Sequence, residues 1–370
     1  MRSRRHFLQA CATAALPGLA AEGAKPFSFI LLGDLHYDSL AHHDFKWLAE
    51  HHAGDLSQIQ NYSRLTTEVM PGVFAAVKQR ITAQRESAAP PAFVLQVGDL
   101  VEGLCGNAEL SVKQNREAVA FVAKQELGVP FLFTKGNHDV TGDGAVEAFN
   151  EVLLPFMAKE AKQIDERASN TKANHLVTCG ESQFAFFDAY DKTSLEWLEA
   201  VAAKRTGRHL FVIIHPPVVP YGARATWHLY AGEKARAQRE KLLDILGQQE
   251  AMVLGGHLHK FSALTRLAGG KRFSQLAVSS VVSALNQTPK NELHGIASYN
   301  GDQVKLEPKH APETAEVRRE LYETERKSVT AFQYADAAGY AVVTVNDGNV
   351  EAAIHAGTRV DVFQRVKISM

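Results

Sequence analysis

The sequence predicts an α/β fold, and two observations lead to that prediction. Five short runs of mostly Phe, Leu, Ile and Val each end just before polar side chains, at residues 29–32, 93–97, 129–133, 210–214 and 252–254. Runs of this length and composition are typical of strands buried on both faces. Helical patterns separate the first three runs, which favours a β-α-β-α-β order with parallel strands and crossover helices.

Two helices are expected to connect the first three strands. Between Leu65 and Ile81, apolar residues recur at every fourth position, which is the pattern of an amphipathic helix. Pro71-Gly72 interrupts this pattern, so the helix either kinks or starts anew there. The stretch 107–127 is expected to form the second helix, which Gly128 ends.

The second half of the chain alternates shorter elements. A hairpin is expected from residues 175–179 and 183–188, with helices at 146–162, from Thr193 onward and at 235–246. A charged stretch at 308–327 is either a helix or a linker. Strand patterns follow at 340–345, 350–354 and 360–368, the first two joined by Asn346-Asp347-Gly348. These last strands either close the sheet or pack as a small β extension.

Composition and charge narrow the function. The chain has 370 residues, of which 45% are hydrophobic and 22% charged, as is ordinary for a globular protein. Its formal net charge of -1 gives no electrostatic reason to expect nucleic acid as a partner. The 16 histidines are the unusual feature, because several of them follow the expected strands.

The first 24 residues are expected to be a targeting segment. Ser3-Arg4-Arg5-His6-Phe7-Leu8 is followed by an Ala-rich, mildly apolar stretch that runs to Ala21. This is the pattern of a twin-arginine signal peptide, and a disordered basic tail is the alternative. A signal of this type predicts the twin-arginine export machinery as a partner and a periplasmic or secreted destination. No stretch is long and apolar enough for an integral membrane anchor.

The cysteines predict neither a zinc site nor a redox centre. Cys11 lies in the targeting segment, which leaves Cys105 and Cys179. An oxidising compartment would allow this pair to form a disulfide. Twin-arginine cargo is normally folded before export, which favours two buried free thiols. Neither residue has Cys-x-x-Cys spacing.

The polar residues that follow the strands are candidate metal ligands. They are Asp34, His36, Asp99, Asn137, His215, His257 and His259. Ligands bind at the carboxyl ends of strands in α/β sheets, so these side chains are expected to converge. Carboxylates, imidazoles and an amide carbonyl, without a thiolate, suit two divalent ions of Mn, Fe, Zn, Co or Ni. Asp99 is the natural bridge between two ions, because it stands alone after its strand.

This ligand set predicts phosphoester hydrolysis. Two ions about 3.5–4 Å apart clamp a phosphoryl oxygen and lower the pKa of a bridging water, which makes hydroxide available as a nucleophile. His138 follows the ligand Asn137 and is left over, and its imidazole can donate a proton to the leaving oxygen. The expected partner is therefore a small phosphoester.

For two further segments the sequence leaves two alternative roles. Residues 38–61 contain His42, His43, His51 and His52 and form either a surface loop with a short helix or a lid near the site. Residues 218–232 contain Pro220, Tyr221, Arg224, Trp227, His228 and Tyr230 and form either a substrate wall or an ordinary loop.

The ordered motifs resemble those of the calcineurin-like metallophosphoesterases. They are Asp-x-His at 34–36, Gly-Asp at 98–99, Gly-Asn-His-Asp at 136–139, His215 and Gly-His-x-His at 256–259. The resemblance spans residues 27–260 and implies a four-layer α/β/β/α sandwich. We therefore expect a signal peptide at 1–24, the phosphoesterase domain at 25–315, and a linker with a C-terminal β-rich extension at 316–370.

The resemblance also implies roles for the site residues. One ion would be held by Asp34, His36, Asp99 and His259, and the other by Asp99, Asn137, His215 and His257. His138 would be the proton donor or a phosphate contact. Asp139 would orient His138.

Departures from related patterns narrow the choice. Purple acid phosphatases carry Asp-x-Gly in the first motif and a tyrosine three residues after the bridging aspartate, where this chain has His36 and Glu102. A tyrosinate-iron site is therefore not expected, and the pattern is closer to phosphodiesterases of the cyclic-nucleotide or broad type. The motifs contact only the phosphoryl group, so monoesters and diesters, phospholipids included, all stay open. The competing function is a metal-free scaffold that binds partners, although none of the expected ligands is lost here.

Overall fold

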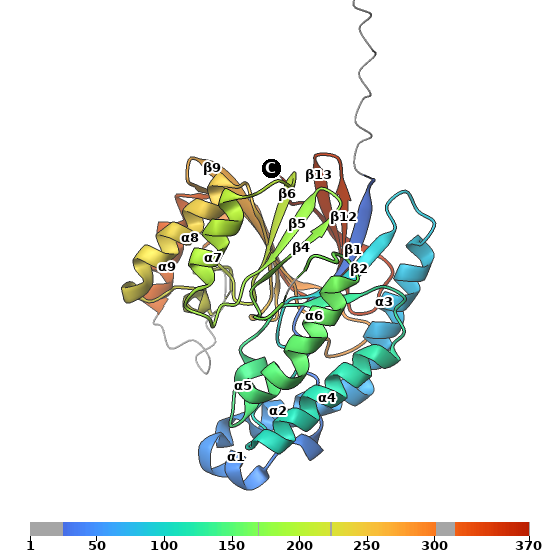
Figure 1. The fold of residues 1–370 in the computed structure, drawn as a ribbon. Coiled ribbons are helices and arrows are strands. Elements are labelled where there is room, and N and C mark those ends of the chain that lie inside the picture. The colour runs from blue at the N-terminus through green and yellow to red at the C-terminus, as the bar shows by residue number, and fades with distance from the viewer. Residues whose placement is uncertain (1–24, 169, 223, 301–314, 370) are drawn as a thin grey trace, which may run out of the picture.

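The computed structural model describes residues 25–168, 170–222, 224–300 and 315–369, and within them the strands form two sheets (Figure 1). The expected signal peptide and Cys11 lie outside these residues. The first sheet has the order β14-β13-β12-β1-β2-β3 and the second the order β10-β11-β8-β9-β7-β6-β5-β4. In chain order, the strands are β1 Phe27–Leu32, β2 Pro91–Gln96, β3 Phe131–Phe133, β4 His175–Cys179, β5 Ser182–Phe186, β6 His209–Ile213, β7 Met252–Gly255, β8 Phe261–Ala268, β9 Lys271–Ala277, β10 Lys290–His294, β11 Val329–Asp336, β12 Gly339–Asn346, β13 Asn349–Ala356 and β14 Val362–Lys367.

Nine helices lie outside the two sheets in the described part of the chain. They are α1 Phe45–His51, α2 Leu56–Glu68, α3 Met70–Gln84, α4 Ala108–Lys124, α5 Ala145–Ala148, α6 Leu154–Lys162, α7 Ser194–Ala203, α8 Arg236–Gln248 and α9 Ala315–Arg326. A π-helical turn, Phe149–Leu153, joins α5 to α6. The interrupted pattern around Pro71 corresponds to two helices, α2 and α3, rather than to one kinked helix. None of the described helices is long and apolar enough to cross a membrane.

The core between the sheets is built from aromatic side chains that alternate along the strands. Phe29 of β1 stacks on Phe93 of β2 with ring centroids 5.1 Å apart, and Phe184 of β5 stacks on Phe211 of β6 at 4.6 Å. Phe29 also meets Phe211 edge to face at 5.7 Å, which joins the two sheets. Successive strand residues point to opposite faces, so these rings fill the space between the sheets.

The intervening strand residues face the helices. Ile30 and Val94 of the first sheet pack with Phe74 of α3, and Val212 of the second packs with Leu242 of α8. Figure 1 shows α3 and α4 on one side of the two sheets and α7 and α8 on the other. Both faces of each sheet are buried, which confirms the predicted four-layer α/β/β/α sandwich.

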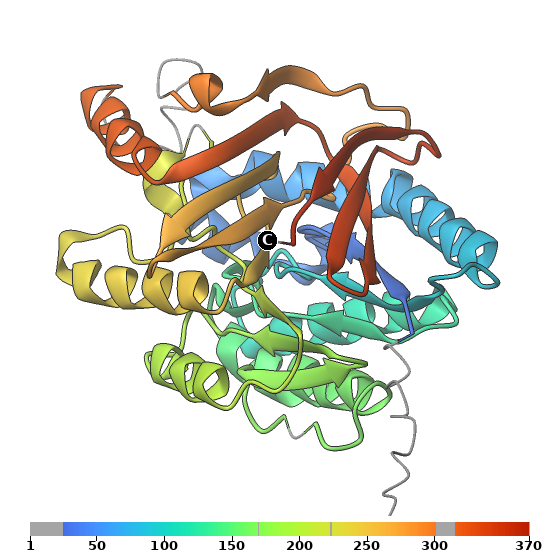
Figure 2. The same ribbon diagram turned by 90° about the horizontal axis from the view of Figure 1, so that it is seen from above.

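The C-terminal strands are integral to the two sheets. β12 pairs antiparallel with β1, from Phe27 opposite Val345 to Leu31 opposite Ala341, and β11 pairs antiparallel with β8. Figure 2 shows the red C-terminal strands next to the blue strand β1. Of the two alternatives for this β-rich tail, closure of the sheet is therefore the one observed. The domain boundary after residue 315 stays a prediction.

Candidate metal centre

The seven candidate ligands lie together at one edge of the two sheets. Asp34 and His36 follow β1, Asp99 follows β2, and Asn137 follows β3. His215 follows β6, and His257 and His259 follow β7. Because β1, β2 and β3 run parallel, as do β5, β6 and β7, their carboxyl ends deliver these loops to a common place.

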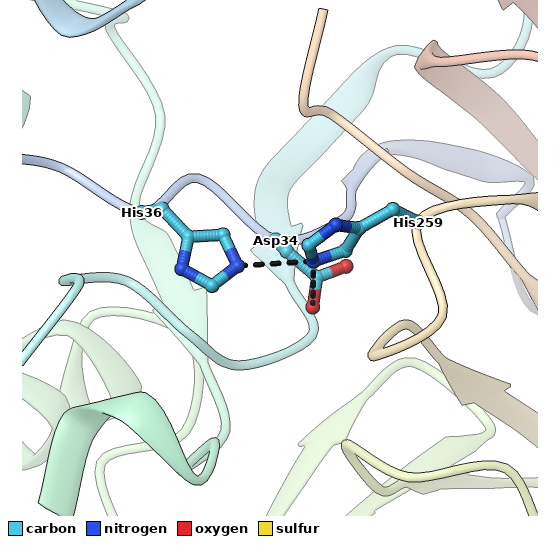
Figure 3. A group of neighbouring side chains, drawn as sticks. All are labelled: Asp34, His36 and His259. Atoms are coloured by element: carbon cyan, nitrogen blue, oxygen red, sulfur yellow. Dashed lines mark hydrogen bonds and ion pairs between the residues drawn. The ribbon is translucent and has the colours of Figure 1, made fainter. Parts of the chain in front are cut away.

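One group of ligand atoms contains Asp34, His36 and His259. The Nε2 atoms of His36 and His259 are 3.0 Å apart, and His259 Nε2 lies 3.7 Å from Asp34 Oδ1. Figure 3 shows the three side chains close together, Asp34 and His36 from the loop after β1 and His259 from the loop after β7. All three atoms lie within the few ångströms that one ion would span.

A second group forms around the Nε2 atom of His215. This nitrogen lies 3.0 Å from Asp99 Oδ2, 3.2 Å from Asn137 Oδ1 and 3.2 Å from His257 Nδ1. The four groups come from loops after four different strands, so the fold rather than local sequence brings them together.

Two carboxylates lie between the groups. Asp99 Oδ2 is 3.0 Å from His215 Nε2 and 3.7 Å from His36 Nε2. Asp34 Oδ1 is 3.7 Å from both His215 Nε2 and His259 Nε2. The position of Asp99 suits the bridging role expected of it, and Asp34 lies nearly as centrally.

Hydrogen bonds on the far side of two imidazoles direct their lone pairs inward. His215 Nδ1 donates to the Val97 carbonyl at 2.8 Å, and His36 Nδ1 donates to Glu102 Oε2 at 2.7 Å. In a neutral imidazole the other nitrogen is then an unprotonated acceptor. When the two rings are neutral, their Nε2 atoms present lone pairs to the carboxylate and amide oxygens around them. Such a cluster of acceptors fits a cation.

Glu102 is a residue of the candidate site that sequence reasoning missed. Its carboxylate is buried and accepts from His36 Nδ1, and its backbone carbonyl accepts from His138 Nδ1 at 2.7 Å. Gln58 Nε2 donates to the second carboxylate oxygen at 3.1 Å. One residue thus orients both a candidate ligand and the candidate acid. The available signal was an acidic residue three positions after Asp99. The contrast with purple acid phosphatases considered this position only because their tyrosine is missing there.

Asp139 has a different role from the one that the resemblance implied. Its carboxylate accepts backbone N–H groups of Leu100 at 2.9 Å, Val101 at 3.1 Å and Gly136 at 2.7 Å. These bonds tie the loop after β2 to the loop after β3. The expectation that Asp139 orients His138 is corrected accordingly, because Glu102 holds that ring.

The backbone at the site is strained where the ligands lie. His36, Asp99, His257 and His259 have φ angles of 48°, 56°, 72° and 53°. Residues other than glycine seldom adopt this left-handed conformation, and such strain persists where the surrounding structure enforces it, often at functional sites. A Cβ atom on Gly136 would lie 2.1 Å from Asp99 Oδ1, so this motif position accepts only glycine.

The electrostatics of the site reflect its buried carboxylates. Burial alone would lower the pKa of His36, but the hydrogen bond to Glu102 and the charges of Glu102, Asp99 and Asp34 raise it to about 9. Burial followed by the charge of His215 lowers the pKa of His257 to about 3. An ion that binds here therefore competes with protons at some ring nitrogens, and its affinity is expected to rise with pH.

One further observation indicates that these residues fit a metal ion. Asp34 Oδ2 is buried and has no hydrogen-bond partner among the described residues. A buried carboxylate oxygen without a partner is costly. Cation coordination removes that cost, and borderline divalent metals suit this donor set of imidazoles, carboxylates and an amide oxygen.

A cavity of about 250 Å³ opens above the ligands. His138, His257 and His259 are among the residues that line it. His52, Asp55 and Gln58 also line it, so the segment 38–61 borders the cavity, and its role as a lid stays a prediction. Arg224 and Trp227 of the segment 218–232 line it as well, and the substrate-wall role of that segment stays a prediction.

Other predicted residues lie away from this cavity. His42 and His43 are buried, and His43 Nε2 lies 2.8 Å from Asp38 Oδ1. Cys105 and Cys179 are both free, as preferred from the sequence.

The comparisons with known proteins agree with this geometry. The sequence model of the family described as calcineurin-like phosphoesterase matches residues 27–261. A mouse (Mus musculus) protein named manganese-dependent ADP-ribose/CDP-alcohol diphosphatase is 24% identical over 184 residues, which cover 49% of this chain and 49% of the mouse protein. The chain thus spans about half the length of this relative.

Solved structures share the fold at low sequence identity. A purple acid phosphatase from yellow lupin (Lupinus luteus) has a TM-score of 0.53 and 12% identity, covering 93% of this chain and 54% of the lupin chain. A dimetal phosphatase from Danio rerio has a TM-score of 0.51 and 11% identity, covering 93% and 98% of the two chains. The family match spans more than half of the sequence and includes all seven candidate ligands, and the chain therefore belongs to the calcineurin-like phosphoesterase family.

Proposed function

We propose that this protein is a dinuclear metal-dependent hydrolase of phosphoesters. The observation that carries the proposal is the convergence of imidazole nitrogens and carboxylate oxygens around His36 Nε2 and His215 Nε2, at separations of 3.0–3.7 Å. The far-side hydrogen bonds on both rings leave acceptors facing acceptors, an arrangement that needs a cation or a proton between them.

The two groups would hold one ion each. Asp34, His36 and His259 would hold the first, and Asn137, His215 and His257 the second, with Asp99 shared. When bound, the two ions would polarise the phosphoryl group and supply a hydroxide nucleophile at neutral pH. The ions are divalent Mn, Fe, Zn, Co or Ni, and the mouse relative is by name manganese-dependent.

His138 would transfer the proton to the leaving oxygen. Its Nδ1–H is held by the Glu102 carbonyl at 2.7 Å, which leaves Nε2 as the nitrogen that faces the cavity lined by this residue. General acid catalysis at that atom would neutralise the alkoxide as the ester bond breaks. Asp139 would contribute by fixing the loop that carries His138.

The substrate would be a small phosphoester whose phosphoryl group lies at the metal centre. Monoesters and diesters, including cyclic nucleotides and phospholipids, share that group. The mouse relative is named as a diphosphatase, so phosphoanhydrides join the panel to be tested. The alternative function, which the test must exclude, is a metal-free scaffold that binds partners.

The test is metal content together with turnover. The purified protein should hold close to two ions per chain and hydrolyse nitrophenyl phosphate or bis(nitrophenyl) phosphate, and chelation followed by Mn²⁺ should abolish and restore turnover. His257→Ala should lose metal, whereas His294→Ala, an exposed histidine on β10, should keep it. Well under one ion per chain, with no turnover after metal addition, would favour the scaffold.

Export by the twin-arginine route is a separate proposal. It rests on Arg4-Arg5 within the signal-like segment. Replacing both arginines with lysine keeps the charge and should leave folded precursor in the cytoplasm of a bacterial host. Unchanged periplasmic delivery in a fractionation assay would contradict the proposal.

A further inference from the structure

A second cavity adjoins the metal centre and is larger than the one above the ligands. Its volume is about 580 Å³, against about 250 Å³ for the first cavity. The candidate ligand His259 lines both of them. We call the larger one the Lys290 cavity, and its polar lining residues include Lys260, Asn286, Gln287, Thr288 and Lys290.

His259 and Tyr62 lie where the two cavities approach each other. Tyr62 lines the first cavity, and its ring meets the His259 ring edge to face with centroids 6.4 Å apart. Tyr62 also belongs to one packed apolar cluster with Val281 and Ala338, which both line the Lys290 cavity. A phosphoryl group held at the metal centre would therefore adjoin both cavities.

The Lys290 cavity carries an excess of positive charge. Among the described residues that line it, Lys260 and Lys290 are cationic, and Asp336 is the one carboxylate. That carboxylate is already engaged, because Lys260 Nζ lies 2.8 Å from Asp336 Oδ1 and the Tyr334 hydroxyl donates to the same oxygen at 2.9 Å. Within the described ranges, no carboxylate lies within 4.0 Å of the exposed Lys290 ammonium. The charge of Lys290 therefore suits an acidic group on a ligand.

The number of cavities bears on the class of phosphoester. A phosphomonoester carries one organic group on phosphorus and needs room on one side of the metal centre. A phosphodiester carries two, of which one leaves and the other stays attached to phosphorus. The candidate acid His138 lines the first cavity and not the Lys290 cavity, so the leaving group belongs in the first. The Lys290 cavity is then the place for the group that stays attached.

We propose that the protein hydrolyses phosphodiesters and that the Lys290 cavity binds the retained alcohol group, which carries an acidic substituent paired with Lys290. This substrate class rests on the proposed phosphohydrolase function. In the reaction, water adds to phosphorus and gives up a proton, the bond from phosphorus to the leaving oxygen breaks, and that oxygen takes a proton from His138. The products are a free alcohol in the first cavity and a phosphomonoester whose organic group lies in the Lys290 cavity.

The first experiment varies only the charge of the retained group. Hexyl, sulfonatohexyl and trimethylammoniohexyl nitrophenyl phosphate share one leaving group, and the parent protein should have its highest kcat/KM with the sulfonate and its lowest with the ammonium. Lys290→Gln should lower the preference for sulfonatohexyl over hexyl by about 2- to 5-fold, the size expected for an exposed ion pair. The change should lie mainly in KM, because the contact is the same before and during the reaction. Lys290→Glu should lower the preference further. Lys241→Glu, at an exposed lysine of α8 that lines neither cavity, is the matched control.

The second experiment fills the Lys290 cavity. Ala284 lines it and is exposed, so Ala284→Trp places a large ring in the space without a demand on the core. The variant should raise KM for hexyl nitrophenyl phosphate more than for nitrophenyl phosphate, which has no retained organic group. Val360→Trp, at an exposed position outside both cavities, should treat the two substrates as the parent does.

The outcomes separate this inference from the proposed function. An unchanged preference in both Lys290 variants, or the same change in Lys241→Glu, would overturn the assignment of the acidic group to Lys290. Equal effects of Ala284→Trp on the diester and the monoester would overturn the placement of the retained group. If the metal-loaded protein hydrolyses no phosphoester, the proposed function fails. Calorimetric binding of sulfonatohexyl methylphosphonate to the parent and to Lys290→Glu then still decides whether the cavity takes an acidic group.

Discussion

Two buried histidines with nearly the same aromatic contact have opposite acid–base properties. His36 stacks on Tyr62 with centroids 4.3 Å apart and planes at 4°, and His175 stacks on Phe186 at 4.2 Å and 7°. The pKa of His36 is raised to about 9, whereas burial lowers the pKa of His175 to about 4.

The partner of Nδ1 accounts for the difference. His36 Nδ1 contacts the Glu102 carboxylate at 2.7 Å, and further carboxylates lie near its other nitrogen. His175 Nδ1 contacts only a neutral acceptor, the Ala173 carbonyl, at 2.9 Å. Burial and stacking are therefore structural features that many histidines share. The concentration of buried negative charge is what distinguishes the candidate metal centre.

The largest expected effect comes from removing that charge where the two groups meet. Asp99→Asn keeps the shape of the side chain but withdraws a negative charge from both groups at once. Metal content should fall well below two ions per chain, and kcat/KM should fall by roughly 10³-fold or more, since metal stabilisation is worth several kcal/mol. A variant with two ions and near-normal turnover would exclude the bridging role.

The next effect separates proton transfer from metal binding. His138→Ala should keep close to the parent metal content, because no ligand atom is lost. With an alkyl phosphoester, kcat/KM should fall by about 10²–10⁴-fold, the range for general acid catalysis. A nitrophenyl ester should lose much less, since nitrophenolate leaves without a proton. Equal losses on both esters would make His138 a phosphate contact instead, and loss of metal would make it a ligand.

A smaller effect is expected when the partner of His36 changes its charge. Glu102→Gln preserves the size of the side chain and an oxygen that can accept from Nδ1, but removes the carboxylate charge. Metal affinity should fall by about 10–100-fold, as is usual for groups that orient a ligand. Isothermal titration of Mn²⁺ into the chelator-treated protein measures this. Glu126→Gln, on an exposed glutamate, should bind like the parent.

The comparison of histidines also explains how far sequence reasoning reached. His36, His257 and His259 could be identified because each follows an apolar run, and a strand end fixes where its loop must lie. The same logic placed His175 inside a strand and assigned it no chemistry. Position along a strand is a local property, which an amino-acid pattern records well.

What the sequence did not predict depends on contacts between distant residues. Glu102 and Asp139 both lie in motif loops, and only the folded backbone brings the Glu102 carbonyl to His138 Nδ1 while the Asp139 carboxylate accepts backbone N–H groups. The pairing of β12 with β1 joins residues more than 300 positions apart, as in Phe27 opposite Val345, so no local pattern determines it.

The smallest expected effect concerns His175, whose replacement should change the pH dependence of stability rather than activity. The folded-state pKa of about 4 lies below the ordinary value of 6.5, so below pH 6.5 the unfolded chain binds a proton that the folded protein excludes. The stability that the neutral ring contributes is complete above pH 6.5 and is lost as the pH falls toward 4. Over two pH units this amounts to about 2–3 kcal/mol.

A residue without a titrating ring removes this loss. His175→Gln keeps an N–H donor for the Ala173 carbonyl but cannot take up the proton, so its free energy of unfolding should fall less than that of the parent between pH 7.5 and pH 4.5. Urea titrations of both proteins at the two pH values give the difference, in which contributions from other groups cancel. His294→Gln, at an exposed histidine, should follow the parent. If His175→Gln also follows the parent, burial at this position does not exclude the proton, and the contrast with His36 rests on the carboxylates alone.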